Sequence, residues 1–347
     1  MAKPTLGIIG GGQLGSLLAE AAKKIEVNTV VFSDDPNSPA KNFTDKFIYS
    51  KYNDLENINR FEKVVDIITF EFENIPFETL NTINQKKPVL PNPKINKIIQ
   101  NRYSEKNFLK KLNIKTTNYE LIKSEKDIEF NKKLLPGLLK TCTLGYDGKG
   151  QYKINKIDNL SNLNIKFNVE FILEKLINIK KEISVIVTRF GKNKYEIYEP
   201  IENLHEHQIL KKSKIPADIS KEHIEKSKKW TIKIAENLDY IGTMCVEFFI
   251  DKKDELYVNE IAPRVHNSGH LTINSHNISQ FENHVRAVCK LEQKKTKKLY
   301  NAEMINLLGN EINNYRGKIL KKNQFFYDYL KKEIKEKRKM GHVTIIE

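Results

Sequence analysis

The sequence has no run of 18 or more apolar residues, so it predicts no membrane-spanning helix. Its first residues lead into a predicted strand and lack the apolar stretch of a signal peptide. Only three cysteines occur, Cys142, Cys245 and Cys289, and they lack the spacing of a metal site or a disulfide framework. We therefore expect a reducing, cytoplasmic setting.

Acidic residues are also scarce relative to basic ones, 44 against 59, which gives a net charge of +15. Such a charge raises the possibility of a nucleic-acid partner. The lysines are dispersed over the whole chain, however, and lack the aromatic interleaving of a nucleic-acid-binding face. We expect no nucleic-acid partner and a surface that attracts anionic small molecules, with a nucleic-acid-binding module as the alternative.

The chain has enough apolar residues to form folded domains. The hydrophobic fraction is 39%, with 17 Phe and 14 Tyr, which excludes a disordered chain. Residues 5–90 alternate strand and helix patterns, with strands expected at 5–9, 28–32 and 64–72 and a helix at 14–24. This alternation predicts a doubly wound, Rossmann-like domain. The prolines at 88, 91 and 93 mark its end, so we place this domain over residues 1–93.

The remaining chain reads as α+β. Residues 94–112 predict an amphipathic helix or helix pair, 134–210 short strands with turns, and 224–238 and 279–291 two further helices. The last 55 residues read as a small strand-rich module. We expect a second domain over 94–290, with a subdomain at about 118–178, and a small C-terminal domain over 291–347.

Two glutamates, Glu247 and Glu260, occupy apolar flanks on either side of a polar turn, Asp251 to Glu255. This pattern predicts a β-hairpin in which the two carboxylates lie opposite each other on one face. Like charges so placed repel unless a cation lies between them, and paired carboxylates suit Mg²⁺. The alternative is a solvated hairpin with two unrelated acids.

The first glycine loop, Gly10 to Gly15, follows a predicted strand and precedes a predicted helix in the pattern G-x-G-x-x-G. Asp34 and Asp35 follow about 20 residues later, as in a dinucleotide-binding fingerprint. Backbone N–H groups at such a helix start can hold an anion. From these residues alone, a dehydrogenase is a serious alternative.

The second glycine loop, Gly145 to Gln151, has three glycines within six residues and lies between predicted strands. Its backbone amides could fold over phosphates, with Lys140 and Lys149 adding positive charge. Beside a magnesium-binding hairpin, this loop indicates phosphoryl transfer from ATP, where positioning and charge neutralisation dominate catalysis. A surface hairpin loop is the alternative.

A dense polar run, residues 262–270, follows the glutamate hairpin. Arg264 could bind an oxyanion with two hydrogen bonds, and Asn267, Ser268 and the Gly269 amide could hold a phosphate. The alternative is a polar loop with capping roles. Near the C-terminus, a basic stretch at 331–342 is more typical of a solvated face than of a site when taken alone.

Taken in order, these segments resemble the N5-carboxyaminoimidazole ribonucleotide synthetase family, ATP-grasp ligases of purine biosynthesis. The resemblance extends from Gly10 to His342. Its most specific stretches are residues 10–15, 69–74, 145–151, 259–270, 279–282 with His284, Arg286 and Ala287, and 338–342. It implies an α/β and α+β architecture: an ATP-grasp fold with a Rossmann-like preATP-grasp domain and a small C-terminal domain. The implied reaction is ATP-dependent carboxylation of 5-aminoimidazole ribonucleotide by bicarbonate, through carboxyphosphate.

The resemblance also implies roles for individual residues. Glu247 and Glu260 would hold Mg²⁺. The nucleotide would be bound by Arg102, Lys140, Gly145, Tyr146, Asp147, Gly148, Lys149, Gly150, Gln151, Glu174, Lys175, Leu176, Ile177, Glu182, His205, Asn259 and Glu260. Catalysis would depend on Asp147, Arg264 and His266. The ribonucleotide would be bound by Gly12, Gln13, Leu14, Glu73, Asn267, Ser268, Lys331 and Arg338. No NAD is implied, and the expected assembly is a homodimer.

The chain departs from the family pattern at a few positions. Val265, Leu271 and Lys337 stand where the family usually has proline, tryptophan and glycine. Ala262 stands where many ATP-grasp relatives have a metal-binding asparagine. In a regular strand, Asn259 would point away from Glu260, so a third protein ligand for the metal is not identified.

Overall fold

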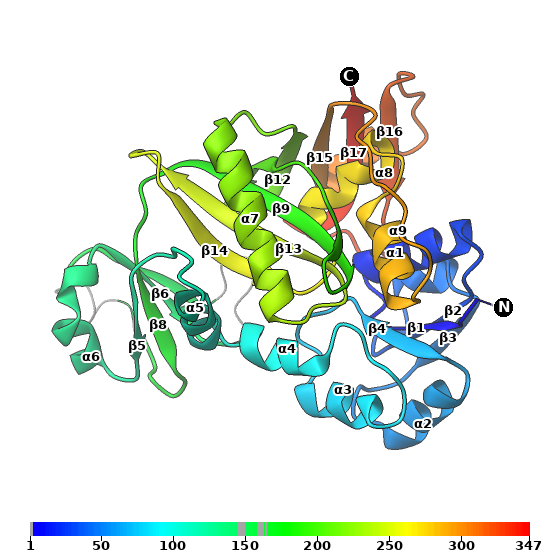
Figure 1. The fold of residues 1–347 in the computed structure, drawn as a ribbon, viewed down its shortest axis with the longest axis horizontal. Helices are drawn as coiled ribbons and strands as arrows, with labels where there is room; N and C mark the ends of the chain where they lie inside the picture. Colours follow the sequence, from blue (N-terminus) through cyan, green and yellow to red (C-terminus); the bar gives the residue numbers. More distant parts are fainter. Residues whose placement is uncertain (1–2, 144–149, 158–162, 164) are drawn as a thin grey trace.

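The computed structural model describes residues 3–143, 150–157, 163 and 165–347 (Figure 1). The N-terminal part is a parallel sheet of order β3-β2-β1-β4. Its strands are β1 Leu6–Ile9, β2 Thr29–Ser33, β3 Lys46–Tyr49 and β4 Ile67–Phe70. The strands expected at 5–9, 28–32 and 64–72 are therefore confirmed.

Helices cover both faces of this sheet, because its strands are apolar on both sides. Helix α1 (Gln13–Lys24) packs in one buried cluster with Leu6 and Ile8. Helices α2 (Leu55–Lys63) and α3 (Phe77–Asn84) pack in another cluster, with Phe32 and Phe70. The doubly wound arrangement follows, and it places the glycine loop at the carboxyl end of β1.

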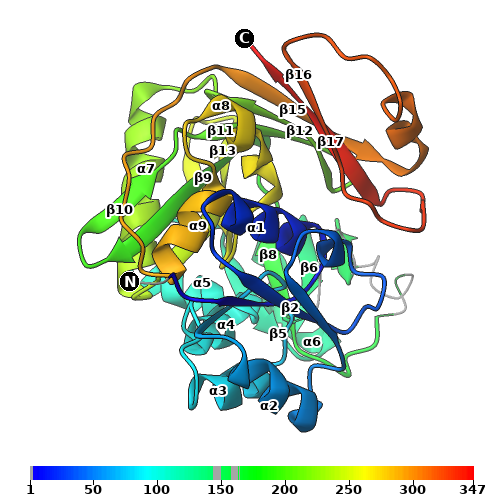
Figure 2. The ribbon, with the colours of Figure 1, turned by 90° about the vertical axis from the view of Figure 1, so that its right-hand side faces the viewer.

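A nine-stranded sheet forms the centre of the molecule, in the order β14-β13-β9-β11-β12-β15-β17-β16, with β10 paired to β9. Its strands are β9 Ile179–Gly191, β10 Lys194–Ile197, β11 Ile201–Glu206, β12 Ile209–Ile215, β13 Gly242–Asp251, β14 Leu256–Ala262, β15 Ala302–Leu308, β16 Gln324–Asp328 and β17 Lys339–Ile346. The C-terminal strands continue this sheet, since β15 pairs with β12 (Figure 2).

A separate four-stranded antiparallel sheet, of order β5-β8-β6-β7, lies at the left of Figure 1. Its strands are β5 Tyr119–Ile122, β6 Gly137–Thr141, β7 Gln151–Ile154 and β8 Phe171–Lys175. Helix α6 (Glu125–Phe130) packs on it through Ile128, in a core of its own. Strands β6 and β7 flank the second glycine loop, of which residues 144–149 lie outside the described residues.

The segment 94–112 is a helix pair, α4 (Pro93–Ile99) and α5 (Arg102–Lys111). The side chain of Asn101 accepts a hydrogen bond from the Ser104 amide, which caps α5 and separates it from α4. Helix α7 (Lys221–Asn237) packs on the nine-stranded sheet through Ile234 and Ala235 (Figure 1). In the described part of the chain, no helix is long and apolar enough to cross a membrane.

Helix α9 (Gln280–Val288), with the short helix α8 (Thr272–Ser275) before it, joins the N-terminal sheet to the central sheet. Buried His284 contacts Thr69 Oγ1 at 2.8 Å through Nε2 and accepts a hydrogen bond from the Thr243 amide at Nδ1. Its Nε2 therefore carries the ring proton. Burial lowers the pKa of His284 to about 3, so this junction is held by a neutral ring.

Candidate active site

A cavity of about 900 Å³ opens where the nine-stranded sheet meets the four-stranded sheet. Helix α5, the first glycine loop and the C-terminal basic stretch also border it. Most residues that the sequence predicted for a site line it. They are Gly12, Gln13, Leu14, Glu73, Arg102, Lys140, Gln151, Glu182, His205, Glu247, Asn259, Glu260, Arg264, His266, Asn267, Lys331 and Arg338. Segments separated by more than 300 residues in the sequence thus converge on one space.

Other predicted residues lie outside the cavity wall. Glu174 is buried behind Lys140, and Ser268 is buried behind His266. Lys175 ends β8, Leu176 and Ile177 follow it, and Gly150 precedes β7; none of these four borders the cavity. Gly145, Tyr146, Asp147, Gly148 and Lys149 lie outside the described residues.

The glutamate hairpin forms as predicted, with Glu247 on β13 directly opposite Glu260 on β14. The pairing depends on a β-bulge, because the next pair along the hairpin is Phe248 with Val258, and Asn259 is the extra residue. The expectation that Asn259 points away from Glu260 assumed a regular strand and is wrong here. Asn259 lines the same cavity as both carboxylates.

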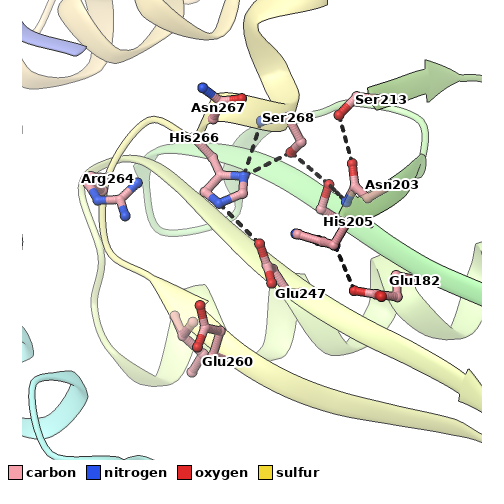
Figure 3. Close-up of polar contacts among 12 residues, drawn as sticks. Glu182, Asn203, His205, Ser213, Glu247, Glu260, Arg264, His266, Asn267 and Ser268 are labelled. Atoms are coloured by element: carbon pink, nitrogen blue, oxygen red, sulfur yellow. Dashed lines mark hydrogen bonds and ion pairs between the residues drawn. The ribbon is translucent and has the colours of Figure 1, made fainter. Parts of the chain in front are cut away.

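Glu247 is held by His266, whose Nε2 lies 3.1 Å from the Glu247 Oε1 atom (Figure 3). The Ser268 amide donates to His266 Nδ1, so Nε2 is the ring nitrogen that donates to the carboxylate. Burial alone would raise the pKa of Glu247, but the His266 hydrogen bond, with His205 and Arg264 nearby, holds that pKa below its usual value. Glu247 is therefore ionised, and its second carboxylate oxygen is not engaged by His266.

A buried chain of hydrogen bonds fixes the ring of His266. Ser268 Oγ lies 2.8 Å from His266 Nδ1 and 2.7 Å from Ser184 Oγ, which accepts from Asn203 (Figure 3). The Gln280 side chain binds both the amide and the carbonyl of His266. Because this chain runs through β9 and β11, the position of His266 is set by the central sheet.

A second histidine faces the cavity from β11. This residue is His205, whose Nδ1 atom lies 2.8 Å from Glu182 Oε2 on the neighbouring strand β9 (Figure 3). Burial lowers the pKa of His205, but the contact with Glu182 and the charge of Glu247 raise it above the ordinary value overall. The pair presents a carboxylate and an imidazole to the same side of the cavity, which suits recognition of hydroxyl groups.

Helix α5 and strand β6 each contribute a positively charged side chain to the cavity wall. Arg102 Nη1 lies 3.2 Å from Glu260 Oε2, and Lys140 Nζ lies 2.7 Å from Glu174 Oε2. Burial alone would raise the pKa of Glu174, but Lys140 and Lys106 lower it to about 2. Lys140 thus lies beside an ionised carboxylate at the cavity edge, where it can also contact an anionic ligand.

Glu174→Gln is expected to lower the free energy of unfolding by about 3 kcal/mol near neutral pH, because it leaves Lys140 and Lys106 without their buried counter-charge. The folded pKa of Glu174 lies below its ordinary 4.5, so its stabilisation is present above pH 4.5 and is lost as the pH falls toward 2. Urea unfolding at several pH values should show the two proteins converging in acid. Glu170→Gln, at an exposed pair with Lys123, is the control, and a pH-independent difference would contradict this assignment.

The first glycine loop starts α1 as predicted, but one of its amides is already taken. Glu71 Oε1 accepts a hydrogen bond from the Gly12 amide at 2.8 Å. Burial raises the pKa of Glu71, while the Gly12 amide, Arg264 and Lys331 lower it, and the net shift is upward. Asp34 and Asp35 do not line the cavity. The part of this loop that lines the cavity is Gly12 to Leu14, facing the C-terminal strands.

Arg264 lies on the loop that leaves β14, pointing into the cavity (Figure 3). Its Nε and Nη2 atoms both contact Glu73 Oε2, at 3.0 and 2.9 Å, and its Nη1 binds the Val265 carbonyl. Burial lowers the pKa of Arg264, but Glu73 and the other carboxylates raise it overall, so it stays charged. A fixed guanidinium can bind a planar oxyanion.

The C-terminal cations close the cavity from the other side. Lys331 Nζ donates to Gln13 Oε1 at 3.3 Å and to the Lys339 carbonyl, which connects the C-terminal strands to the glycine loop. Lys337 has a φ of 62°, in the left-handed region that favours glycine. This conformation explains why the family pattern has glycine at that position, and the chain instead adds a cation beside Arg338.

Several residues that line the cavity were missed by sequence reasoning, among them Glu71, Glu105, Lys337 and Lys339. Glu71 lies within the stretch 69–74 that carried the family resemblance, so its position was a usable signal. Glu105 looks like one acid of a charged helix face and offered no such signal.

The donors at the hairpin suit a hard cation. Glu247 and Glu260 supply carboxylate oxygens, and Asn259 an amide oxygen, at one cavity wall. Oxygen ligands of this kind, few in number, are typical of Mg²⁺ sites that complete their coordination with phosphate and water. Within residues 3–143, 150–157, 163 and 165–347, no group of three or more His, Cys, Asp or Glu side chains is placed to hold a metal.

Family models match three consecutive parts of the chain. A model of the ribonucleotide synthetase preATP-grasp domain matches residues 3–100, and one of the ATP-grasp domain matches residues 107–281. A model of the phosphoribosylaminoimidazole carboxylase C-terminal domain matches residues 302–347. The matched ranges run in the order that the sequence resemblance implies.

Curated relatives and solved structures agree with these matches. The chain is 37% identical to the N5-carboxyaminoimidazole ribonucleotide synthase of Bacillus subtilis (strain 168), over 98% of this chain and 91% of the relative. It is 38% identical to that of Staphylococcus aureus (strain MRSA252), over 99% and 92%. A structure of N5-carboxyaminoimidazole ribonucleotide synthetase with ADP superposes with a TM-score of 0.92 at 35% identity, covering 100% of this chain and 93% of that one.

The enzyme from Aspergillus clavatus, solved with ADP and 5-aminoimidazole ribonucleotide, superposes with a TM-score of 0.91 at 27% identity, covering 99% of this chain and 94% of that one. The order of the three matched parts and the nearly full-length similarity point to one group of enzymes. The chain belongs to the N5-carboxyaminoimidazole ribonucleotide synthase family of ATP-grasp ligases.

Proposed function

We propose how this chain carries out the reaction of its family, the ATP-dependent carboxylation of 5-aminoimidazole ribonucleotide by bicarbonate. The observation that carries the proposal is the pairing of Glu247 with Glu260 at the wall of a cavity that also contains Arg264 and Lys331. The reaction transfers the ATP γ-phosphoryl group to bicarbonate, giving carboxyphosphate and ADP. Carboxyphosphate then delivers CO₂ to the exocyclic amine and releases phosphate.

The nucleotide occupies the part of the cavity between the two antiparallel sheets. We assign adenine to the backbone of residues 174–177, at the end of β8 and outside the cavity lining described above. We assign the ribose hydroxyls to Glu182 and His205, which the 2.8 Å contact of this pair supports. Lys140, Arg102 and the loop 145–151 neutralise the phosphates. Glu247 and Glu260 hold Mg²⁺, with Asn259 beside them; the ion supplies charge neutralisation for the phosphate oxygens.

Bicarbonate and carboxyphosphate bind beside Arg264 and His266. The guanidinium of Arg264 holds the carboxyl oxygens, and its contacts with Glu73 and the Val265 carbonyl fix its direction before substrate enters. We assign orientation of the substrates to the ring of His266, which Ser268, Gln280 and Glu247 hold in place. We assign proton handling at the exocyclic amine to Asp147, in the loop that follows β6.

The ribonucleotide lies between the first glycine loop and the C-terminal strands. Gly12, Gln13, Leu14 and Glu73 line one side, and Asn267, Ser268, Lys331 and Arg338 lie on or behind the other. Lys331 is supported as a phosphate ligand by its position between Gln13 and the basic stretch 337–339. Point charges on lysine and arginine suit a phosphate monoester.

Lys331→Ala is expected to raise the KM for 5-aminoimidazole ribonucleotide by about tenfold or more, because one charge-assisted hydrogen bond to its phosphate is lost. The KM for ATP should change little, since the nucleotide binds on the opposite side of the cavity. Steady-state kinetics with each substrate varied in turn measure both. Lys318→Ala, an exposed lysine outside the cavity lining, is the control, and equal increases in both KM values would remove Lys331 from the phosphate site.

Three further properties belong to this proposal. The buried free thiols of Cys142, Cys245 and Cys289 support a cytoplasmic enzyme. The assembly is a homodimer. The domains divide at residues 93 and 290, with the four-stranded sheet as the part of 118–178 that closes over the nucleotide.

The deciding experiment measures ADP release from ATP and bicarbonate with and without 5-aminoimidazole ribonucleotide. Stimulation by this ribonucleotide alone supports the proposal. Stimulation by a different amine of nucleotide metabolism, with none by 5-aminoimidazole ribonucleotide, would instead indicate another ATP-grasp ligase. Salt-sensitive binding to duplex DNA without any ADP release would favour the nucleic-acid alternative.

A further inference from the structure

Strand β14, which carries Glu260, is an edge strand of the nine-stranded sheet. On its outer side β14 has one isolated bridge, at Val258, whose amide donates to the Lys115 carbonyl and whose carbonyl accepts from Thr116 Oγ1. The bulge at Asn259 interrupts the ladder on its inner side as well. Two backbone groups of β14 flank Glu260 directly: the carbonyl of Asn259 and the amide of Ile261. A strand so placed would be free to shift unless other groups bind its backbone.

Two adjacent residues of α5 bind these two groups. Lys106 Nζ donates to the Asn259 carbonyl at 2.5 Å, and Glu105 Oε1 accepts from the Ile261 amide at 2.5 Å. Lys106 donates from an ammonium group, which makes its hydrogen bond stronger than a neutral one. Burial raises the pKa of Glu105 to about 8, although Lys106 lowers it, so near neutral pH this carboxyl accepts mostly in its neutral form. The backbone on both sides of Glu260 is therefore held by one turn of one helix.

Both side chains are buried, with 2% of each residue exposed. Burying charge is costly unless it is paired and hydrogen-bonded. Lys106 meets this condition, because it also donates to Thr116 Oγ1 at 2.9 Å and lies 3.7 Å from Glu174 Oε1. Glu105 lies next to Lys106 and binds the Ile261 amide. Because both side chains are buried, they do not contribute to a solvated surface. Their hydrogen bonds are made to the backbone of β14.

The same helix also contacts the Glu260 side chain. Arg102, one turn before Glu105 on α5, binds the Glu260 carboxylate at 3.2 Å. Residues spaced three and four apart share one helix face, so Arg102, Glu105 and Lys106 all point toward β14. Lys106 also contacts Glu174, the residue that binds Lys140. Helix α5 thus lies between the hairpin and the lysine of the four-stranded sheet.

We propose that Glu105 and Lys106 are positioning residues: by holding the Asn259 carbonyl and the Ile261 amide, they set the direction of the Glu260 carboxylate toward Mg²⁺. They act through the backbone of β14, and neither is a metal ligand. This inference rests on the proposed role of Glu260 in holding the ion. It adds a set of residues whose loss weakens the metal site while the nucleotide's other contacts remain.

The test measures ADP binding to the full-length protein by calorimetry, at saturating Mg²⁺ and with EDTA. In Lys106→Met and Glu105→Met, the gain in ADP affinity that Mg²⁺ provides is expected to fall about tenfold, as for other residues that orient metal ligands. Affinity in EDTA should stay unchanged. Glu105→Gln keeps an oxygen that accepts from the Ile261 amide, so its gain should stay within about twofold of the unmodified protein. Lys110→Met, an exposed lysine of the same helix, is the matched control.

Three results would overturn the inference. If Glu105→Gln is impaired as strongly as Glu105→Met, the charge of Glu105 matters and it acts as a ligand. If affinity in EDTA falls as much as affinity in Mg²⁺, the effect is general loosening. If the Mg²⁺-dependent gain is unchanged in both methionine variants, the backbone contacts do not position Glu260.

Two more variants keep the result interpretable. Thr116→Val removes one partner of Lys106 and also the hydrogen bond from Thr116 Oγ1 to the Val258 carbonyl of β14, so it loosens the same strand. It should reduce the Mg²⁺-dependent gain by about threefold. This variant decides the question if thermal melting shows that the methionine variants do not fold. In that case, an unchanged Mg²⁺-dependent gain in Thr116→Val would overturn the inference. Glu260→Gln separates the two proposals: if it leaves the gain intact, the metal role of Glu260 fails. If only Glu260→Gln removes the gain, the inference about α5 fails alone.

Discussion

Glu260→Gln is expected to lower ATP turnover by a factor on the order of 1,000 or more while leaving the fold intact. The carboxylate of Glu260 is 41% exposed and contacts Arg102, so an amide of the same shape creates no buried unpaired group. What is lost is one of two negative charges that hold Mg²⁺ against the nucleotide phosphates. Because phosphoryl transfer depends mainly on such charge neutralisation, the effect should appear in kcat.

ADP release at saturating substrates measures this loss, and circular dichroism with thermal melting checks the fold. Glu255→Gln is the matched control, since Glu255 lies in the turn of the same hairpin and pairs with exposed Lys115. ADP release near the unmodified rate in Glu260→Gln would count against the metal assignment. A comparable loss in Glu255→Gln would show that the hairpin itself had been disturbed.

Arg264→Lys should lower kcat by about 100-fold to 1,000-fold, the range found when one preorganised donor to a developing anion is removed. The guanidinium contacts Glu73 through two nitrogens and the Val265 carbonyl through a third. A lysine ammonium has no planar fork and cannot make these contacts and bind an oxyanion at once. The KM for ATP should change little, because Arg264 is assigned to the carboxyl group of bicarbonate and carboxyphosphate and not to the nucleotide.

Steady-state kinetics with ATP and bicarbonate varied separately measure the effect. Arg316→Lys, at an exposed pair with Asp328, provides a control for the loss of a bidentate arginine elsewhere in the protein. Full activity of Arg264→Lys would show that a point charge is sufficient at this position. A large rise in the KM for ATP would instead place Arg264 at the nucleotide.

The facing glutamates could be predicted because a polar turn between two apolar flanks specifies a hairpin. The β-bulge that allows this pairing could not be predicted. A hairpin of regular pairs centred on Lys253, as Phe248 with Val258 requires, would place Glu247 opposite Asn259. The bulge adds one residue to β14 and restores the pairing of the two glutamates. Since no residue type marks this bulge, the position of Asn259 was predicted wrongly.

Elements with strong local patterns were equally predictable. The segment 94–112 separates into two helices where Asn101 caps the second, and the strands of the N-terminal sheet lie where apolar runs end at turns. The roles of Glu105 and Lys106 were not predictable, because adjacent charges on a helix are typical of a solvated face. Only the packing of α5 against β14, distant in sequence, shows that they are buried.

The continuity of the central sheet has a consequence for constructing shorter versions of this enzyme. Strand β15 pairs with β12 over Lys212 to Ile215, so a protein ending before residue 302 would leave the outer backbone groups of β12 unpaired. Exposed edges of this kind recruit other chains and promote aggregation. The last 46 residues matched by the C-terminal family model should therefore be kept even where ribonucleotide binding is not required.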